Sequence, residues 1–157
     1  MNPKLFAFLT LIISWISLIF IPKEQVKKYT PVSIFTSLIV SLIFVVATDL
    51  GWWKLKKPVI PGLKSINMFY VFGPFFIGTI WIFKLVYKIG FLPYLLTNAL
   101  IDSFFTYVFL PFAEKIGIGK IHISRISILS LMLSTSLAIY GFQKWYENPS
   151  KTEKSVS

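Results

Sequence analysis

Residues 5–21 read LFAFLTLIISWISLIFI, a run with no charged side chain over the length of a membrane crossing. A hydrocarbon core about 30 Å thick needs roughly 20 helical residues, with a range of about 17–25. Backbone groups in lipid must satisfy one another, so such runs form α-helices rather than strands. Similar runs follow along the chain, and the predicted spans are residues 5–21, 31–50, 66–86, 91–112 and 126–143.

The sequence therefore predicts an all-α, polytopic helical membrane protein with five transmembrane helices joined by short loops, four helices being the alternative. Residues 1–157 would form a single membrane domain, with 144–157 as a polar, disordered tail. No small-x-small cleavage pattern precedes Pro22, so we expect the first run to be a retained helix rather than a signal peptide.

Composition supports this class and excludes several others. Hydrophobic residues make up 55% of the chain and the mean hydropathy is +0.73, too apolar for an ordinary soluble domain. The chain has no cysteine and one histidine, His122, so disulfides, thiolate metal sites and cysteine nucleophiles are excluded. No P-loop, HExxH or serine-nucleophile motif is present. We expect no metal, no cofactor and no enzymatic activity.

The strong positive charge is typical of membrane flanks rather than of a nucleic-acid surface. The chain has sixteen basic and six acidic residues, for a formal charge of +10, and all but one of the basic residues are lysines. They lie between the apolar runs, where they would meet anionic lipid head groups. We expect the bilayer as partner and no nucleic acid. With five helices the two membrane sides hold equal numbers of Lys and Arg, so charge leaves the orientation open.

Prolines and glycines mark the predicted helix boundaries. Pro22 would end the first helix, residues 22–30 would form an interfacial turn, and Pro31 would lie in the first turn of the second helix. Gly73-Pro74 would break the third helix. The short link near Lys88 makes the third and fourth helices an antiparallel hairpin.

The fourth predicted span carries the only acid deep inside an apolar run. An ionisable group near a bilayer centre costs about 2.5–3.5 kcal/mol on insertion scales, so it normally has a partner or a role. Asn98, Asp102 and Thr106 recur every four residues and would share one helix face. We expect this polar stripe to face the bundle or a cavity, with the carbonyl that Pro74 frees on the third helix as a hydrogen-bond acceptor.

Two interpretations of the stripe remain open. In the first, hydrogen bonds from the stripe hold the helices together, each worth about 0.6 kcal/mol on average. In the second, the stripe and the Gly73-Pro74 break line a proton or cation path.

The last predicted span carries small residues at spacings of three or four, which predict that this face packs against another helix. They are Ser127, Ser130, Ser134, Ala138 and Gly141.

Several stretches resemble a known group of proteins. They are Ile21-Pro22-Lys23, Lys28-Tyr29, Pro31-Val32, FGPFFIGTIWIF at residues 72–83, Tyr94 with Asn98 and Asp102, and YGFQK at residues 140–144. The chain is similar here to small uncharacterised multi-pass membrane proteins of Bacillus-type (Firmicutes) bacteria. The resemblance implies a bacterial plasma membrane and no particular mechanism.

The leading functional hypothesis from the sequence is a structural or partner-binding membrane protein. The partner would be another membrane protein or a second copy of the chain. The alternative is a small transporter or channel component with a proton- or cation-responsive stripe on the fourth helix. The sequence names no substrate and does not decide the oligomeric state.

Overall fold

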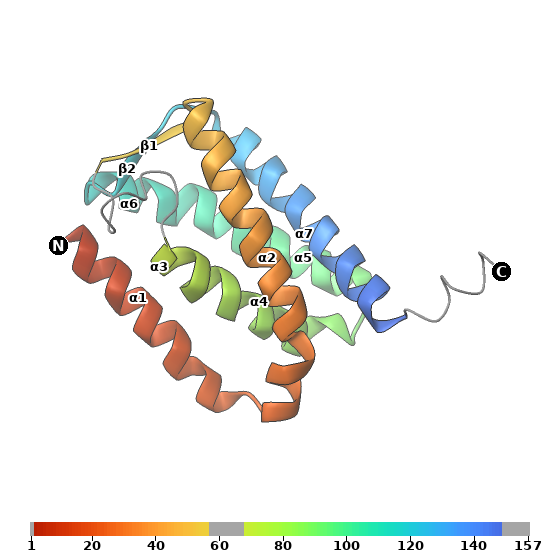
Figure 1. Ribbon diagram of the computed structural model, residues 1–157. Helices are drawn as coiled ribbons and strands as arrows, with labels where there is room; N and C mark the ends of the chain where they lie inside the picture. Colours follow the sequence, from red (N-terminus) through yellow and green to blue (C-terminus); the bar gives the residue numbers. More distant parts are fainter. Residues whose placement is uncertain (1, 57–67, 149–157) are drawn as a thin grey trace.

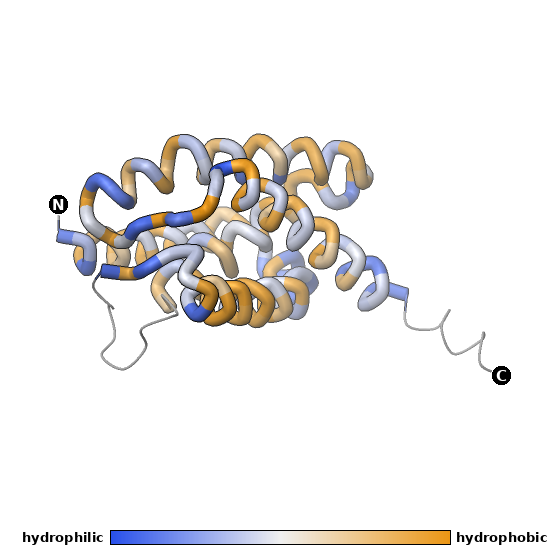
Figure 2. The backbone as a smooth tube through the Cα atoms, turned by 90° about the horizontal axis from the view of Figure 1, so that it is seen from above, coloured by the Kyte–Doolittle hydropathy of each residue, from blue (hydrophilic) through white to orange (hydrophobic). Residues whose placement is uncertain are grey.

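The computed structural model describes residues 2–56 and 68–148. Within them the chain is almost entirely helical, and hydrophobic residues run along the helices while hydrophilic ones gather near helix ends (Figure 2). The regular elements are α1 (Pro3–Ser17), α2 (Lys23–Asp49), β1 (Trp53–Leu55), α3 (Met68–Tyr70), α4 (Phe76–Ile82), α5 (Phe91–Phe104), α6 (Leu110–Lys115), β2 (Gly119–Ile121) and α7 (Arg125–Glu147).

Five helical segments are long and apolar enough to cross a membrane, which confirms the predicted all-α polytopic fold. Short 3₁₀ and π-helical turns join neighbouring elements into these segments, which are Pro3–Phe20, Lys23–Asp49, Met68–Tyr87, Phe91–Lys115 and Arg125–Glu147. In Figure 1, α1 lies at the edge of the bundle, and α2 and α7 run side by side.

The second helix begins at Lys23, so the expected turn over residues 22–30 is helical and Pro31 lies inside the helix. A proline in a helix interior costs about 3 kcal/mol. Tertiary packing offsets this cost, because the Tyr29 ring is buried against Phe83 and Tyr87, with centroids 5.6 and 6.1 Å away. Phe83 and Tyr87 are far from Pro31 in the sequence, so local sequence patterns could not reveal their contribution.

The third segment bends at Gly73-Pro74. Gly73 has φ −94° and ψ −105°, outside the helical range, within the π-helical turn Val71–Phe75 between α3 and α4. A Cβ atom at Gly73 would lie 3.2 Å from the Leu11 Cα of α1, so the glycine lets the two backbones approach closely. Trp15 of α1 fixes the contact, since its indole N–H donates to the Phe72 carbonyl at 3.0 Å.

A two-stranded antiparallel sheet, β1 with β2, covers one end of the bundle (Figure 1). Both strands lie in segments that the sequence predicts as loops, because three-residue strands are too short for a period-two pattern to stand out. Lys54 lies opposite Lys120 and both are exposed, whereas their neighbours Trp53 and Ile121 are half-buried. The sheet therefore has a lysine-bearing outer face and an apolar inner face.

At the opposite end, an aromatic cluster and one glutamate join three segments. Tyr87 donates to Glu147 Oε2 at 2.8 Å, and Lys28 forms an ion pair with Glu147 at 3.1 Å. α7 thus continues through Lys144 to Glu147, beyond its predicted end at residue 143. The rest of the predicted tail, from residue 149, lies outside the described residues, as does the predicted start of the third span at residue 66.

The expected small-residue packing face of α7 points outward. Ser127, Ser130, Ser134, Ala138 and Gly141 are all exposed in this structure. The hydroxyls of Ser130 and Ser134 bond carbonyls of their own helix at 2.9 and 2.8 Å, so they need no neighbour. α7 packs instead through another face, formed by Ile128, Ser136, Ile139 and Gln143.

Candidate functional site

The predicted polar stripe lies in the interior of the bundle. Asn98 and Asp102 on α5 are each 6% exposed, and Thr106, in the π-helical turn Phe105–Phe109 that follows, is 0% exposed. Four-residue spacing keeps the three side chains on neighbouring positions of one face. The interior of the bundle is thus polar along one line.

The hydrogen bonds of the stripe run to α7. Ser136 Oγ donates to Asn98 Oδ1 at 3.2 Å, and the Tyr94 hydroxyl donates to the Ser136 carbonyl at 2.9 Å. Thr106 Oγ1 contacts Met132 Sδ at 3.7 Å. The expected partner was a carbonyl freed by Pro74, but in the described part of the chain no such bond forms. The kinked segment beside Pro74 contacts α1 instead, where the Trp15 indole N–H donates to the Phe72 carbonyl.

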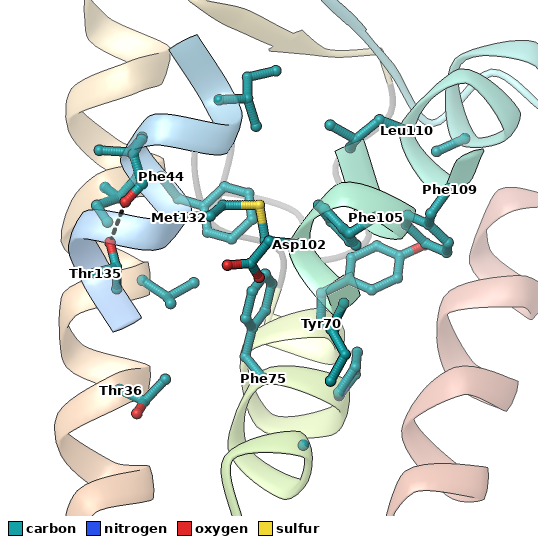
Figure 3. Close-up of a pocket in the computed structure, with 18 of the residues that line it drawn as sticks. Thr36, Phe44, Tyr70, Phe75, Asp102, Phe105, Phe109, Leu110, Met132 and Thr135 are labelled. Atoms are coloured by element: carbon teal, nitrogen blue, oxygen red, sulfur yellow. Dashed lines mark hydrogen bonds between the residues drawn. The ribbon is translucent and has the colours of Figure 1, made fainter. Parts of the chain in front are cut away.

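Asp102 differs from its two neighbours in the stripe. Its Oδ2 atom is buried and finds no hydrogen-bond partner among the described residues. A buried carboxyl oxygen without a partner is costly, and such groups deserve a functional explanation. Figure 3 shows this carboxyl in the open centre of the bundle, between Met132 and Phe75.

The space in front of Asp102 is a cavity of about 510 Å³. This volume lies within the range of about 300–1,000 Å³ that is usual for small-molecule pockets. Its walls come mainly from α2, α4, α5, α6, α7 and the sheet, and most of the side chains are apolar. Typical wall residues are Val40, Ile43, Leu131 and Ile139.

Aromatic rings and two further unpartnered polar groups complete the lining. Phe44, Phe75 and Phe105 contribute rings, as Figure 3 shows. Tyr70 and Trp53 also line the cavity, and the Tyr70 hydroxyl and the Trp53 indole N–H are buried without partners in the described chain. The cavity thus combines an apolar wall with a few polar groups, the usual composition of a ligand site.

Some lining residues of the third and fourth helical segments are exposed at the surface of the bundle. Leu85, just beyond α4, and Ile101 on α5 both line the cavity, yet they are 56% and 45% exposed. Gly78 lies on the same side of α4, and a Cβ atom added there would meet nothing within 4 Å. Both segments belong to candidate membrane crossings, so these exposed lining residues lie where lipid would cover the bundle.

The second acid that lines the cavity is already engaged. Glu114 Oε1 accepts from the Ile121 N–H at 2.8 Å, and Glu114 Oε2 forms an ion pair with Arg125. These bonds join α6, β2 and the start of α7. Glu114 is therefore a structural group, which leaves Asp102 as the acid with free bonding capacity in the lining.

Residues 2–56 and 68–148 contain no group of three or more His, Cys, Asp or Glu side chains that would hold a metal ion. The sequence located the stripe from its four-residue spacing. It left open whether the stripe faces a cavity and missed the role of Ser136, since neither leaves a pattern in one segment.

Fold and site together describe a multi-pass helical protein of membrane type with a carboxyl facing an internal cavity. No protein-family model matches the chain, and comparison with the curated proteins and with the solved structures gives no significant match.

Proposed function

We propose that this chain is a multi-pass protein of a bacterial plasma membrane that binds a small molecule inside its helical bundle, as a small transporter or a component of one. The observation that carries the proposal is the unpartnered Asp102 oxygen in a cavity of about 510 Å³. An intramembrane acid that faces a cavity is typical of ion and substrate paths. The proposal includes no catalysis.

The geometry makes this function the stronger of the two sequence-derived hypotheses. If the stripe served only to join helices, every member would be expected to have a partner. Asn98 and Thr106 meet that expectation through Ser136 and Met132, but the Asp102 Oδ2 atom does not. In the stripe, Asn98 and Thr106 thus contact the last helix, whereas Asp102 keeps a carboxyl oxygen free for a ligand.

A structural or partner-binding role is the second candidate, and one observation favours it. The small-residue face of α7 is exposed, and small residues allow close approach of helices in lipid. Another membrane protein or a second copy would be the partner. At the sheet, the exposed Lys54 and Lys120 suit anionic lipid head groups rather than nucleic acid.

Single-cysteine labelling in intact membranes tests the proposal, since the chain has no native cysteine. Lys54 and Lys120, at the sheet end of the bundle, also line the cavity and are exposed, so a water-soluble reagent has a route that does not cross lipid. A cavity with unpartnered polar groups and this volume has room for water.

We expect a water-soluble maleimide to label Asn98→Cys and Asp102→Cys, which line the cavity, and not Thr106→Cys, which does not. Leu100→Cys, 74% exposed on the outer side of α5, is the silent lipid-facing control.

Lys120→Cys, exposed on the sheet, is the positive control for a correctly inserted protein. Silence at 98 and 102, with Lys120→Cys labelled, would overturn the proposal. The cavity would then be closed and dry, and the structural role would take first place.

A further inference from the structure

The charge on the cavity wall favours a positively charged ligand. Asp102 carries a carboxyl oxygen without a partner, whereas Glu114 is occupied by Arg125 and the Ile121 N–H. Lys54 and Lys120 also border the cavity, but both are exposed on the outer face of the sheet. An unpaired buried carboxylate is costly, and a cation beside it offsets part of that cost.

The walls favour an organic cation over a bare metal ion. A hard cation needs several oxygen ligands, and the described residues contain no acidic cluster that would supply them. The rings of Phe44, Phe75, Phe105, Tyr70 and Trp53 line the same space. Aromatic faces attract organic cations, and aromatic cages are the usual site for quaternary ammonium groups.

Two exposed residues of the cavity wall restrict the ligand further. Leu85 and Ile101 line the cavity and are exposed within segments that are apolar and long enough to cross a membrane. A ligand that enters beside these residues comes from the hydrocarbon region. Its body must therefore be apolar enough to partition into lipid.

We propose that the ligand is a lipophilic organic cation, which enters from the bilayer between α4 and α5 and is held by Asp102 and the aromatic wall. This inference rests on the proposed function and specifies its substrate class. Gly78 leaves the space that the cation occupies beside α4, since no atom lies within 4 Å of a Cβ placed there.

Tetraphenylphosphonium is a suitable probe, because it has a delocalised positive charge and an apolar body. Its binding to the purified full-length chain in lipid nanodiscs is measured by titration calorimetry and by tryptophan fluorescence, since Trp53 and Trp81 line the cavity. Triphenylphosphine oxide, neutral and a hydrogen-bond acceptor, is the matched uncharged probe.

Three variants separate charge from space. Asp102→Asn keeps the size and removes the charge, and should weaken tetraphenylphosphonium binding by more than about tenfold. Gly78→Leu keeps the charge and fills the cavity, and should weaken binding of both probes. Leu100→Ala changes an exposed residue of α5 outside the lining and should leave binding unchanged. Asp102→Glu should restore most of the cation affinity.

Equal tetraphenylphosphonium affinity in the wild type and Asp102→Asn would overturn the inference. Tighter binding of triphenylphosphine oxide than of tetraphenylphosphonium, lost in Asp102→Asn, would also overturn it. Either result, with Asp102→Cys still labelled by maleimide, leaves a ligand-binding cavity and rejects only the cationic class. A co-purified lipid that the phosphonium does not displace would also overturn it. Absence of labelling at Asp102→Cys rejects the proposed function itself.

Discussion

Ser136 on α7 donates a hydrogen bond of 3.2 Å to the side chain of Asn98 on α5, one helical turn from the unpartnered Asp102. The single hydroxyl hydrogen of Ser136 is shared with the Met132 carbonyl of its own helix, which lies 3.1 Å from Oγ. The interhelical bond thus holds the wall of the cavity in register beside its free carboxyl.

Ser136→Ala should destabilise the protein modestly, because it removes the interhelical bond to Asn98. Such bonds in membrane proteins average about 0.6 kcal/mol and reach about 1.7. Thermal unfolding of the purified protein in mild detergent measures the change. Ser134→Ala is the matched control, since the Ser134 hydroxyl is exposed and bonds the Ser130 carbonyl of its own helix. Equal effects of the two variants would contradict a role for the Asn98 bond.

Gly73→Ala should weaken the packing of α1 on the kink. The new Cβ would lie 3.2 Å from the Leu11 Cα, a backbone atom that cannot move alone. Overpacking of this kind costs about 1–3 kcal/mol. Thermal unfolding reports the loss, and faster proteolysis of α1 would localise it. Gly78→Ala, with no atom within 4 Å of its Cβ, should unfold at or above the wild-type temperature. A Gly73→Ala protein as stable as Gly78→Ala would show that the close approach is not required.

Lys120→Glu should stabilise the sheet, because it replaces two like charges that lie directly opposite each other with an opposite pair to Lys54. Cross-strand pairs of opposite charge contribute about 0.2–1 kcal/mol. The gain should be largest at low salt and shrink as ionic strength rises. Unfolding across a salt series is the measurement, with Lys115→Glu, exposed at the end of α6, as the charge-matched control. A salt-independent or equal gain in both variants would argue against the cross-strand pair.

Tyr87→Phe should loosen the end of the bundle opposite the sheet. The hydroxyl donates to Glu147 at 2.8 Å, and hydrogen bonds to charged groups contribute about 1.5–3 kcal/mol when buried. Glu147 is partly exposed and keeps Lys28 as a partner, so we expect about 1 kcal/mol. Hydrogen exchange in the last turn of α7 should rise. Tyr146→Phe, at an exposed ring, should leave exchange there unchanged. Unchanged exchange in Tyr87→Phe would contradict this anchor.

The location of the stripe residues and the identity of their hydrogen-bond partners were predicted in two different ways, and only the partners differ in the structure. Asn98, Asp102 and Thr106 were located by spacing along a single helix, a local property. Their partners were assigned by assuming that neighbouring helices of a hairpin face one another along the stripe. The structure brings Ser136 and Met132 of the last helix to Asn98 and Thr106 instead, and the identity of a packed neighbour depends on the whole bundle.

Charge-free runs of membrane length determined the fold class, because lipid admits few backbone structures and the helix is the one that a single segment completes by itself. The burial of Asp102 could likewise be anticipated from its depth in an apolar run. Tertiary structure alone decided that α2 begins at Lys23 and encloses Pro31, that β1 pairs with β2, and that the space beside Asp102 stays open. Each of these depends on contacts between residues far apart in the chain, whose energies no single segment contains.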